Sequence, residues 1–558
     1  MALHMQRRLA AGTRTPTDRT VRLNSGTTRP IPCYMRRAFL TLSAATLVLV
    51  ALAAQVWPQV LWSLVVIVPV VLRGVADMLQ TKQAVRRNFP LLGHGRYLLE
   101  KIRPEINQYF VESNHDGRPF SRNDRSVVYQ RAKGELDTLP FGTQRDVYAA
   151  GYEWINHSLA PVHPDTTCAR VRVGGPACAQ PYSASILNVS AMSYGALSMN
   201  AVLALNAGAR AGGFAHNTGE GGLSPYHLEP GGDLVWQIGT GYFSCRTPDG
   251  RFNPDAFAER AALPAVKMIE IKLSQGAKPG HGGILPAAKL TPEIVAIRGV
   301  VPGQDVVSPP AHSTFSTPIG LLQFVQSLRD ASGGKPVGFK LCVGARTEFL
   351  SICKAMLQTG ITADFIIVDG SEGGTGAAPQ EFVDHVGMPL TEGLMMVQNC
   401  LVGTGLREHI RLGASGKITN GFDVVQRVIQ GADFTLAARA MMFAVGCIQA
   451  MKCHTNRCPT GVATQDPALA RALDVPDKID RVASFQNAVV ASAAQMVASM
   501  GLESFSELTP SMLNRRIDCS HSRTYAEIYE WLMPGELLEC PPETWLSDWI
   551  EASAEEFV

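Results

Sequence analysis

Three cysteines, Cys447, Cys453 and Cys458, lie within one stretch of twelve residues. Their C-x5-C-x4-C spacing gathers thiolates, which are the usual ligands of iron–sulfur clusters, and three of them suit a cluster that lacks one iron. A zinc site that adds His454 is an alternative, although its adjacency to Cys453 makes that geometry awkward. A third interpretation is that the three thiols are unrelated core residues.

Glycine and other small residues follow three successive β-rich segments, in the stretches 369–376, 415–421 and 437–440. Backbone without bulky side chains can approach phosphate oxygens, and the loops after the last strands of a barrel commonly bind phosphate. These stretches predict a phosphorylated cofactor. Glycines that merely turn the chain are the alternative for any one loop.

Three cations stand at positions where a charge needs an explanation. Lys340 lies inside an apolar segment, where burial is costly unless an anion or an electron-rich cofactor edge faces the ammonium. A structural ion pair with an acid on a neighbouring strand is the alternative. Lys278, in a glycine-rich segment, and Arg298, twenty residues later, together suit a dicarboxylate substrate, with bidentate binding by the arginine.

The elements that must position these residues show an α/β rhythm from about residue 185 onward. Short, mostly apolar runs alternate with longer helical patterns, as in parallel sheets buried on both faces. Eight runs are expected to be strands: 186–190, 213–217, 234–240, 268–273, 337–343, 365–369, 410–414 and 434–438. Their number predicts a (β/α)8 barrel with its site at the carboxyl ends of the strands. A doubly wound open sheet is the alternative.

Near the N-terminus, residues 38–72 contain no charged side chain, and Gln55, Trp57, Pro58 and Gln59 interrupt the run near its middle. Two apolar halves of about 17 residues reach the lower limit for crossing a bilayer. Arginines and lysines flank both outer ends, so the positive-inside rule predicts a helical hairpin in the inner membrane with the body in the cytoplasm. A secretory signal and a buried soluble hairpin are the alternatives.

Composition excludes several classes of protein. With 558 residues, 46% of them hydrophobic, the chain can bury a large core, and its 12 cysteines are too sparse for a disulfide scaffold. The net charge of +2 hides eight arginines and one aspartate in residues 1–37, which leave 42 basic against 47 acidic residues in the remainder. A body with a net charge of −5 is not expected to bind nucleic acid.

Several motifs together resemble the FMN-binding synthase domain of glutamate synthases, and the whole chain resembles stand-alone glutamate synthase-like proteins. The motifs are Ser190-Ala191-Met192-Ser193-Tyr194-Gly195-Ala196-Leu197-Ser198, Asn217-Thr218-Gly219-Glu220-Gly221-Gly222, residues 269–280, Ser308-Pro309-Pro310-Ala311-His312, Gly373-Gly374-Thr375-Gly376-Ala377 and Cys453-His454-Thr455-Asn456-Arg457-Cys458-Pro459. They follow the family's order across about half the chain, which makes the resemblance specific.

The resemblance implies a (β/α)8 barrel that holds FMN beside a [3Fe-4S] cluster ligated by Cys447, Cys453 and Cys458. It implies that ammonia and 2-oxoglutarate condense to 2-iminoglutarate, which reduced FMN converts to L-glutamate. Lys278 and Arg298 would bind the 2-oxoglutarate carboxylates, and Met192 and Glu220 would line the substrate side. The residues expected to contact FMN are Ser193, Gly195, Lys340, Gly373, Gly374, Thr375, Gly376, Ser415, Gly416, Gly421, Ala438 and Arg439.

The expected organisation follows from these patterns. It comprises a disordered basic N-terminus (1–37), a transmembrane helical hairpin (38–73), a linking and capping region (80–184), the FMN-binding barrel (185–470) and a helical C-terminal extension (471–558).

The chain departs from the family in ways that bear on substrate and electron donor. It shows no amidotransferase domain, so glutamine hydrolysis is not expected and ammonia or another external amine donor is required. Gly280-His281-Gly282-Gly283-Ile284 replaces the family's usual Gly-Glu-Gly-Gly-Gln, which leaves the keto acid open. The chain also lacks a dinucleotide fingerprint, so electrons must come from a partner such as a ferredoxin.

Other functions remain open at this stage. One is an amine transfer like that of N-methylglutamate synthase. Another is an FMN-dependent hydroxy-acid or amino-acid dehydrogenase that passes electrons to a membrane acceptor; the hydroxy-acid version needs His281 or His312 as a base. A third is a non-catalytic membrane-bound scaffold.

Overall fold

The computed structural model describes residues 31–558, with side chains from Tyr34 onward. The chain divides into two compact units, of which the first ends at Val111 and the second runs from Glu112 to Val558. The predicted linking region at 80–184 therefore does not form one piece, because its first part belongs with the N-terminal helices.

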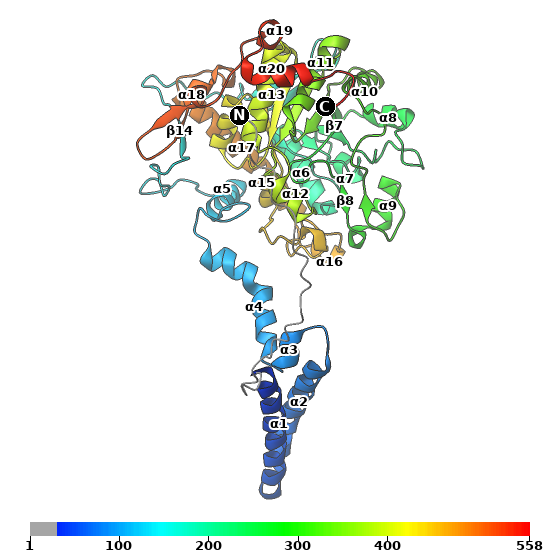
Figure 1. Cartoon of the computed structure of the whole chain (residues 1–558), viewed down its shortest axis with the longest axis vertical. Coiled ribbons are helices and arrows are strands. Elements are labelled where there is room, and N and C mark those ends of the chain that lie inside the picture. Colours follow the sequence, from blue (N-terminus) through cyan, green and yellow to red (C-terminus); the bar gives the residue numbers. More distant parts are fainter. Residues whose placement is uncertain (1–30) are drawn as a thin grey trace, which may run out of the picture. The chain divides into compact units, whose positions relative to one another are not determined.

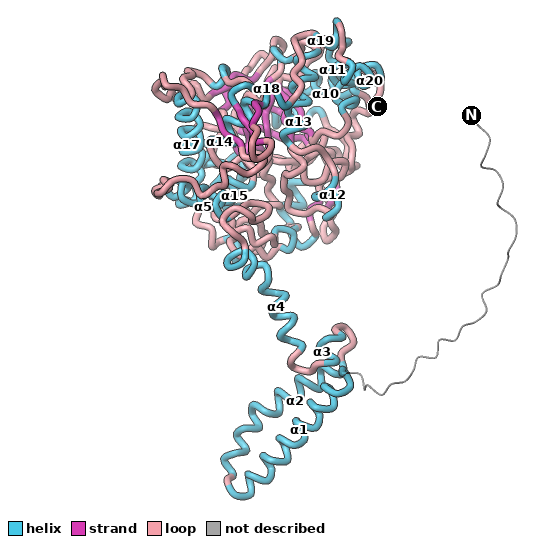
Figure 2. Tube along the Cα trace, turned by 60° about the vertical axis from the view of Figure 1, so that its left-hand side comes forward, coloured by secondary structure: helices cyan, strands magenta, loops and turns pink. Residues whose placement is uncertain are grey.

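The first unit is a helical hairpin followed by shorter helices (Figure 1). Its elements are α1 (Ile31–Val56), η1 (Pro58–Ser63), α2 (Leu64–Leu79), α3 (Ala84–Asn88), α4 (Gly93–Ile106) and the π-helix η2 (Asn107–Val111). Helices α1 and α2 lie side by side in Figure 2. Gly74 lets them approach, since a Cβ there would lie 2.1 Å from the Phe39 ring.

Both helices of the hairpin are long and apolar enough to cross a membrane, at Tyr34–Val56 and Pro58–Leu79. Only 6% of the most apolar window of each is buried within the protein, which does not fit the alternative of a buried soluble hairpin. Length and composition are weak evidence for a membrane by themselves. The break at Trp57 lies where the polar interruption predicted it.

The N-terminal prediction needs a correction. Residues 1–30 of the expected disordered segment lie outside the described residues, but helix α1 begins at Ile31, so disorder is wrong for 31–37. A helix can extend beyond its apolar run, and Pro32 is tolerated in the first turn because its missing N–H has no helical partner there.

The second unit contains a closed barrel of eight parallel strands, in the order β10-β11-β12-β13-β4-β5-β6-β7. The strands are β4 (Leu187–Val189), β5 (His216–Asn217), β6 (Leu234–Ile238), β7 (Val266–Lys272), β10 (Val337–Leu341), β11 (Phe365–Asp369), β12 (Arg411–Ser415) and β13 (Phe434–Ala437). Each overlaps one of the eight predicted runs. Pairing of β13 with β4, with Ala437 opposite Val189, closes the barrel, so the open-sheet alternative is wrong.

Helices surround the strands, as Figure 2 shows for the second unit. Those following or covering the strands are α6 (Met199–Gly212), α7 (Pro225–Leu228), α8 (Pro254–Ala261), α10 (Pro318–Ala331), α11 (Arg346–Thr359), α12 (Gln380–His385), α13 (Leu390–Gly403), η4 (Arg407–His409), α14 (Gly421–Ile429) and α15 (Arg439–Ala444). An insertion between β7 and β10 holds β8 (Ile284–Leu285), η3 (Ala287–Lys289), α9 (Pro292–Arg298) and β9 (Val306–Val307). This insertion carries Arg298 towards the strand ends.

Segments before and after the barrel complete the fold. The preceding ones are α5 (Arg122–Lys133), β1 (Glu153–Ile155), β2 (Arg170–Val173) and β3 (Tyr182–Ser185). The hairpin β2–β3 closes the amino end of the barrel, because Val173 and Ala184 join an apolar cluster with inward residues such as Val235, Phe365 and Leu436. The opposite, carboxyl end is left for the polar loops.

The C-terminal prediction of helices alone is wrong in part. After η5 (Cys453–Thr455), α16 (Pro467–Ala470) and the long α17 (Val475–Ser499), the chain forms η6 (Phe505–Glu507), η7 (Pro510–Met512), β14 (Leu513–Arg516), β15 (Ser522–Thr524), α18 (Tyr525–Ile528), α19 (Glu536–Glu539) and α20 (Glu543–Glu551). Strand β14 pairs with β1, about 360 residues earlier, and with β15. Strands this short and half-buried carry no local signal and depend on their distant partner.

Candidate functional site

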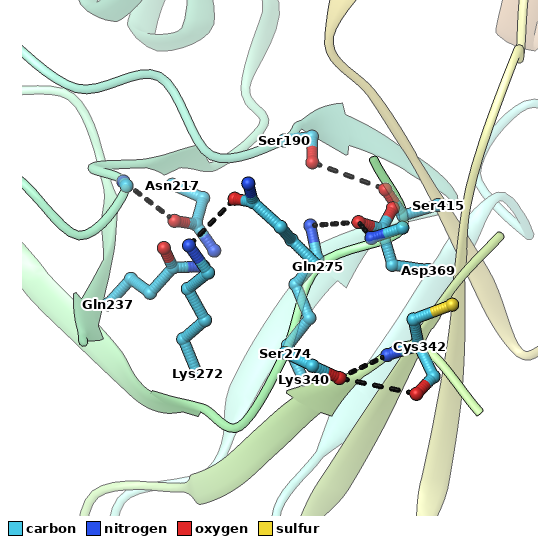
Figure 3. A network of polar contacts seen from close by, with 12 residues as sticks. Ser190, Asn217, Gln237, Lys272, Ser274, Gln275, Lys340, Cys342, Asp369 and Ser415 are labelled. Atoms are coloured by element: carbon cyan, nitrogen blue, oxygen red, sulfur yellow. Dashed lines mark hydrogen bonds and ion pairs between the residues drawn. The ribbon is translucent and has the colours of Figure 1, made fainter. Parts of the chain in front are cut away.

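A polar network occupies the interior at the carboxyl ends of the strands (Figure 3). Asp369, the last residue of β11, shares one carboxylate oxygen between Lys340 Nζ at 3.4 Å and the backbone N–H of Gly276 at 2.8 Å. The ion-pair alternative for Lys340 is thus the arrangement found. Its predicted contact with a cofactor remains a prediction, and the shared carboxylate fixes the loop after β7 against β11.

A second layer of the network lies on β5, β6 and β7. Glu270 accepts hydrogen bonds on Oε1 from Asn217 and Gln237 and is 1% exposed. Burial raises the pKa of Glu270, and the positive charge of Lys340 partly opposes that shift. Glu270 was not predicted from the sequence, although a charged residue inside an apolar run is the signal that also marked Lys340.

The structure brings the predicted substrate residues together around Glu220. Lys272 Nζ lies 2.7 Å from both Glu220 Oε1 and Gln275 Oε1, and Lys278 and Arg298 are close enough to lower the pKa of Glu220 further. Although burial alone would raise that pKa, the three cations leave it below its usual value. Three cations facing one carboxylate make a site that favours an anion.

The two predicted anion-binding residues are both buried. Lys278 is 1% exposed and its Nζ donates to the backbone oxygen of Ala377 at 3.0 Å, while burial lowers its pKa to about 8. Arg298 Nη2 donates to the backbone oxygen of Tyr194 at 3.0 Å, and the guanidinium stacks over the Phe243 ring. Burial lowers the pKa of Arg298 to about 10. Its Nε has no hydrogen-bond partner among the described residues, so a buried donor is left for an anion.

Glycines shape the walls of this cluster. A Cβ on Gly283 would lie 2.4 Å from Glu220 Oε1, and one on Gly221 would lie 2.7 Å from Arg298 Nη2. Met192 is buried beside the same loops, where its backbone N–H donates to Asn217 and its oxygen contacts His227. Ser193 accepts from Leu197 through its backbone, which closes the turn at Gly195 (φ +100°).

On the other side of the strand ends, cations gather near the predicted phosphate loops. Arg439 Nη2 donates to the Glu372 backbone oxygen at 2.7 Å, and its side chain lies where a Cβ on Gly374 would be 2.8 Å away. Burial lowers the pKa of Lys417, as do the nearby charges of Arg439 and Arg118, whereas Glu372 opposes this. Lys417 and Arg118 were missed; a lysine directly after Ser415-Gly416 was the available signal.

The remaining predicted cofactor residues divide into two groups. Ser415 Oγ lies 3.4 Å from Ser190 Oγ inside the network, Gly416 adopts φ +155°, and Gly373, Thr375, Gly376 and Ala438 belong to loops at the same strand ends. Gly421 also packs against α17, because a Cβ there would lie 2.6 Å from the backbone of that helix, and its contact with FMN stays a prediction.

This arrangement fits a phosphorylated, ring-bearing cofactor such as FMN. Lys417, Arg439 and Arg118 supply positive charge beside backbone that side chains do not cover. Gln275 Nε2 and Glu270 Oε2, both buried at the network, lack hydrogen-bond partners within residues 31–558. Unpaired buried polar atoms are costly and indicate a polar group that the chain itself does not provide.

The three cysteines lie close enough to affect one another's charge. Burial raises the pKa of Cys447 to about 12, and Cys453 and Cys458 raise it too. In the part of the chain that the structure describes, no three His, Cys, Asp or Glu side chains lie close enough to hold one metal ion, which disfavours the zinc alternative. In a cuboidal iron–sulfur cluster each cysteine binds a different iron, so the cysteine sulfurs lie farther apart than around a single metal ion.

Hydrogen bonds to its sulfur favour the thiolate form of Cys458. Burial alone would raise its pKa, but the N–H groups of Ala463, Thr460 and Val462 and the Thr460 hydroxyl point at the sulfur, and the pKa is lowered overall. Hydrogen bonds to sulfur are typical of iron–sulfur sites and tune their potential. The donor set therefore fits a cluster on the three cysteines.

The two histidines that a hydroxy-acid mechanism would need differ in environment. His312 contacts Tyr242 Oη at 3.1 Å through Nδ1 and the Lys272 oxygen at 2.9 Å through Nε2, and burial lowers its pKa to about 4. Both ring nitrogens are thus engaged in packing the core. His281 contacts the Gly282 oxygen and the edge of Phe382, and it remains the one of the two with a partly exposed ring.

Comparison with known proteins gives a family. The profile described as the conserved region in glutamate synthase matches residues 179–503. The glutamate synthase large subunit-like protein YerD of Bacillus subtilis is 37% identical over 487 residues, which cover 79% of this chain and 92% of YerD. The archaeal-type glutamate synthase (NADPH) of Thermotoga neapolitana is 34% identical over 320 residues, 57% of this chain.

The archaeal glutamate synthase (NADPH) of Methanocaldococcus jannaschii is 36% identical over 322 residues, again 57% of this chain. The chain spans 60% of the length of these two relatives. Among solved structures, a mutant flavocytochrome b2 with pyruvate bound is 12% identical, with a TM-score of 0.41 over 76% of this chain and 87% of that one. A likeness at this level carries no inference about function.

One prediction concerns the crossing of the loops after β7 and β11. A Cβ on Gly276 would lie 1.7 Å from the backbone oxygen of Gly370, which cannot rotate away. We expect Gly276→Ala to lower the unfolding temperature and to release flavin. Gly95→Ala in α4 is the control, because among the described residues a Cβ there would meet no atom within 4 Å beyond its own helix and chain neighbours, and Gly95 is not expected to contact flavin. Flavin absorbance that is equally retained in both purified variants would contradict this geometry.

Proposed function

Because the chain belongs to the glutamate synthase family, we propose that it reductively aminates 2-oxoglutarate, or a related keto acid, to L-glutamate. Ammonia or another external amine donor supplies the nitrogen, FMN and a [3Fe-4S] cluster serve as cofactors, and a ferredoxin or similar protein supplies electrons. The observation that carries the proposal is the group of buried cations, Lys272, Lys278 and Arg298, around Glu220.

The chain's own residues suit the handling of a dicarboxylate. Arg298, whose Nε has no hydrogen-bond partner among the described residues, can bind one carboxylate in a bidentate manner, and Lys278 can bind the other. Glu220 stays ionised beside Lys272, so it orients that ammonium and holds the net charge of the cluster below three. Gly221 and Gly283 keep side chains out of the space next to these groups.

The atoms and electrons of this reductive amination balance. Ammonia adds to the keto carbon and water leaves, which gives an imino acid; a hydride and a proton then give the amino acid. FMN, when bound, would supply the hydride, and a cluster held by Cys447, Cys453 and Cys458 would supply one-electron chemistry between the donor protein and the flavin. Gly373, Gly374, Ser415 and Arg439 would hold the flavin at the strand ends.

The decisive experiment follows the flavin in the absence of oxygen. Purified full-length protein is reduced with just enough chemical donor, and 2-oxoglutarate with ammonium is added. We expect reoxidation of the flavin together with formation of glutamate, and neither with 2-oxoglutarate alone. Lys278→Met should retain flavin but need a much higher keto acid concentration. If neither 2-oxoglutarate nor a related keto acid reoxidises the flavin, the proposal fails.

A pH dependence follows from Lys278. Its pKa is lowered to about 8 by burial, so the ammonium is charged below pH 8 and loses its proton above it. Affinity for 2-oxoglutarate, measured from the change in flavin spectrum on binding, should be level below pH 8. Above it, affinity should fall by up to about tenfold for each pH unit. Lys278→Met should bind weakly with no such decline, and a level wild-type profile to pH 9.5 would count against Lys278.

We also propose that α1 and α2 span a membrane and leave the barrel in the cytoplasm. Arg36 and Arg37 lie in the first turns of α1, before its apolar run, and Arg86 and Arg87 follow α2, which supports cytoplasmic ends. The protein should stay in membranes washed with alkaline carbonate and dissolve in detergent. A membrane-impermeant maleimide should label the exposed Cys519 and Cys540 in inverted vesicles but not in intact cells, with the double variant Cys519→Ser, Cys540→Ser as control. Release by carbonate would overturn this.

A further inference from the structure

Lys289 is a buried cation that the sequence analysis did not single out. It is the last residue of η3, is 2% exposed, and donates from Nζ to the backbone oxygen of Ala196 at 2.7 Å. Among the described residues, the hydrogen-bond acceptor of the Lys289 ammonium is thus a carbonyl oxygen and not a carboxylate. One carbonyl offsets only part of the cost of burying an ammonium, so another source of negative charge is required nearby.

Hydrogen bonds connect Lys289 to the cysteine loop through its neighbour. Asn456, which lies between Cys453 and Cys458, donates from Nδ2 to the oxygen of Ala288 at 2.8 Å. Asn456 adopts φ +59°, and its Oδ1 accepts the backbone N–H of Gln465 at 2.7 Å. The residue directly before Lys289 is therefore fixed to the loop that carries two of the three cysteines.

The same hydrogen-bond network includes the loop after β4, which is the first loop of the barrel. Gln465 Nε2 donates to the oxygens of Gly195 at 3.1 Å and Leu197 at 2.7 Å, on either side of the Ala196 oxygen that Lys289 binds. A closed ring thus joins η3, the cysteine loop and the loop after β4. That loop is also the one predicted to contact FMN through Ser193 and Gly195.

Two of the cysteine sulfurs lie close enough to Lys289 to interact with its charge. Burial lowers the pKa of Lys289 to about 8, and the thiolates of Cys453 and Cys458 act in the opposite direction. Reciprocally, Lys289 lowers the pKa of Cys453, which burial raises. The ammonium thus lies beside two cluster ligands and is bonded to the flavin-side loop.

We propose that Lys289 is a positioning residue whose positive charge raises the reduction potential of the cysteine-bound cluster. This inference rests on the proposed function, since it requires a cluster on Cys447, Cys453 and Cys458. An added electron makes the cluster more negative, and a fixed buried cation beside it favours that state. The ring through Asn456 and Gln465 keeps the charge in place between the two cofactors.

The test is an EPR-monitored redox titration of the anaerobically purified full-length protein. Lys289→Gln keeps a hydrogen-bond donor for Ala196 but removes the charge, so the midpoint potential should fall. Lys289→Arg should restore a potential close to that of the wild type. Lys335→Gln is the matched control, because Lys335 is also buried and also donates to backbone oxygens, those of Ala261 and Leu263.

Each outcome bears on the inference. An unchanged or higher potential in Lys289→Gln, or an equal shift in Lys335→Gln, overturns it. If Lys289→Gln loses acid-labile sulfide but keeps flavin and its unfolding temperature, while Lys289→Arg keeps the cluster, the charge is needed to retain the cluster, and the inference that it tunes the potential is overturned. Loss of flavin and of thermal stability in both Lys289 variants would show a structural role only. Wild-type protein without labile sulfide would instead refute the proposed cofactors.

Discussion

Glu220 faces three buried cations, Lys272, Lys278 and Arg298, and this uneven charge is the constraint on which the site depends. Buried charges are expensive unless they are paired, and one carboxylate cannot pair with three cations. Lys272 is satisfied by Glu220 and Gln275, whereas Lys278 and Arg298 rely on backbone oxygens. A bound dianion, such as the proposed keto acid, would relieve the cost of this arrangement.

Keeping such a cluster in place requires close contacts between loops. The carboxylate of Asp369 binds both Lys340 and the N–H of Gly276, and Gly276 passes against the backbone of Gly370 with no room for a side chain. Two loops that lie about 90 residues apart in the chain are thereby locked together. On the far side of the barrel mouth, Arg439 binds the backbone of Glu372 and joins the same loop to β13.

Much of this could be predicted from the sequence, because buried parallel strands leave a strong local pattern. All eight strands fell on the predicted apolar runs, and Glu220, Lys278 and Arg298 do converge. Lys272 and Lys289 were missed because a lysine in a loop or at a strand end has no local feature that separates a buried ammonium from a solvated one. Gly421 was predicted as a phosphate-loop glycine, and its packing against α17 could not be predicted from its neighbours in the chain.

By itself, then, the sequence determined what repeats locally or is spelled out by neighbouring residues: an apolar hairpin, eight strands with small residues at their ends, three clustered cysteines and a family resemblance. Only the tertiary structure decided which charges are buried and which of them meet. It placed Lys289 between the first barrel loop and the cysteine loop, and it paired β14 with β1. Whether a charged side chain is buried, and which residue it contacts, depends on segments that can lie hundreds of residues apart. No local sequence pattern encodes either.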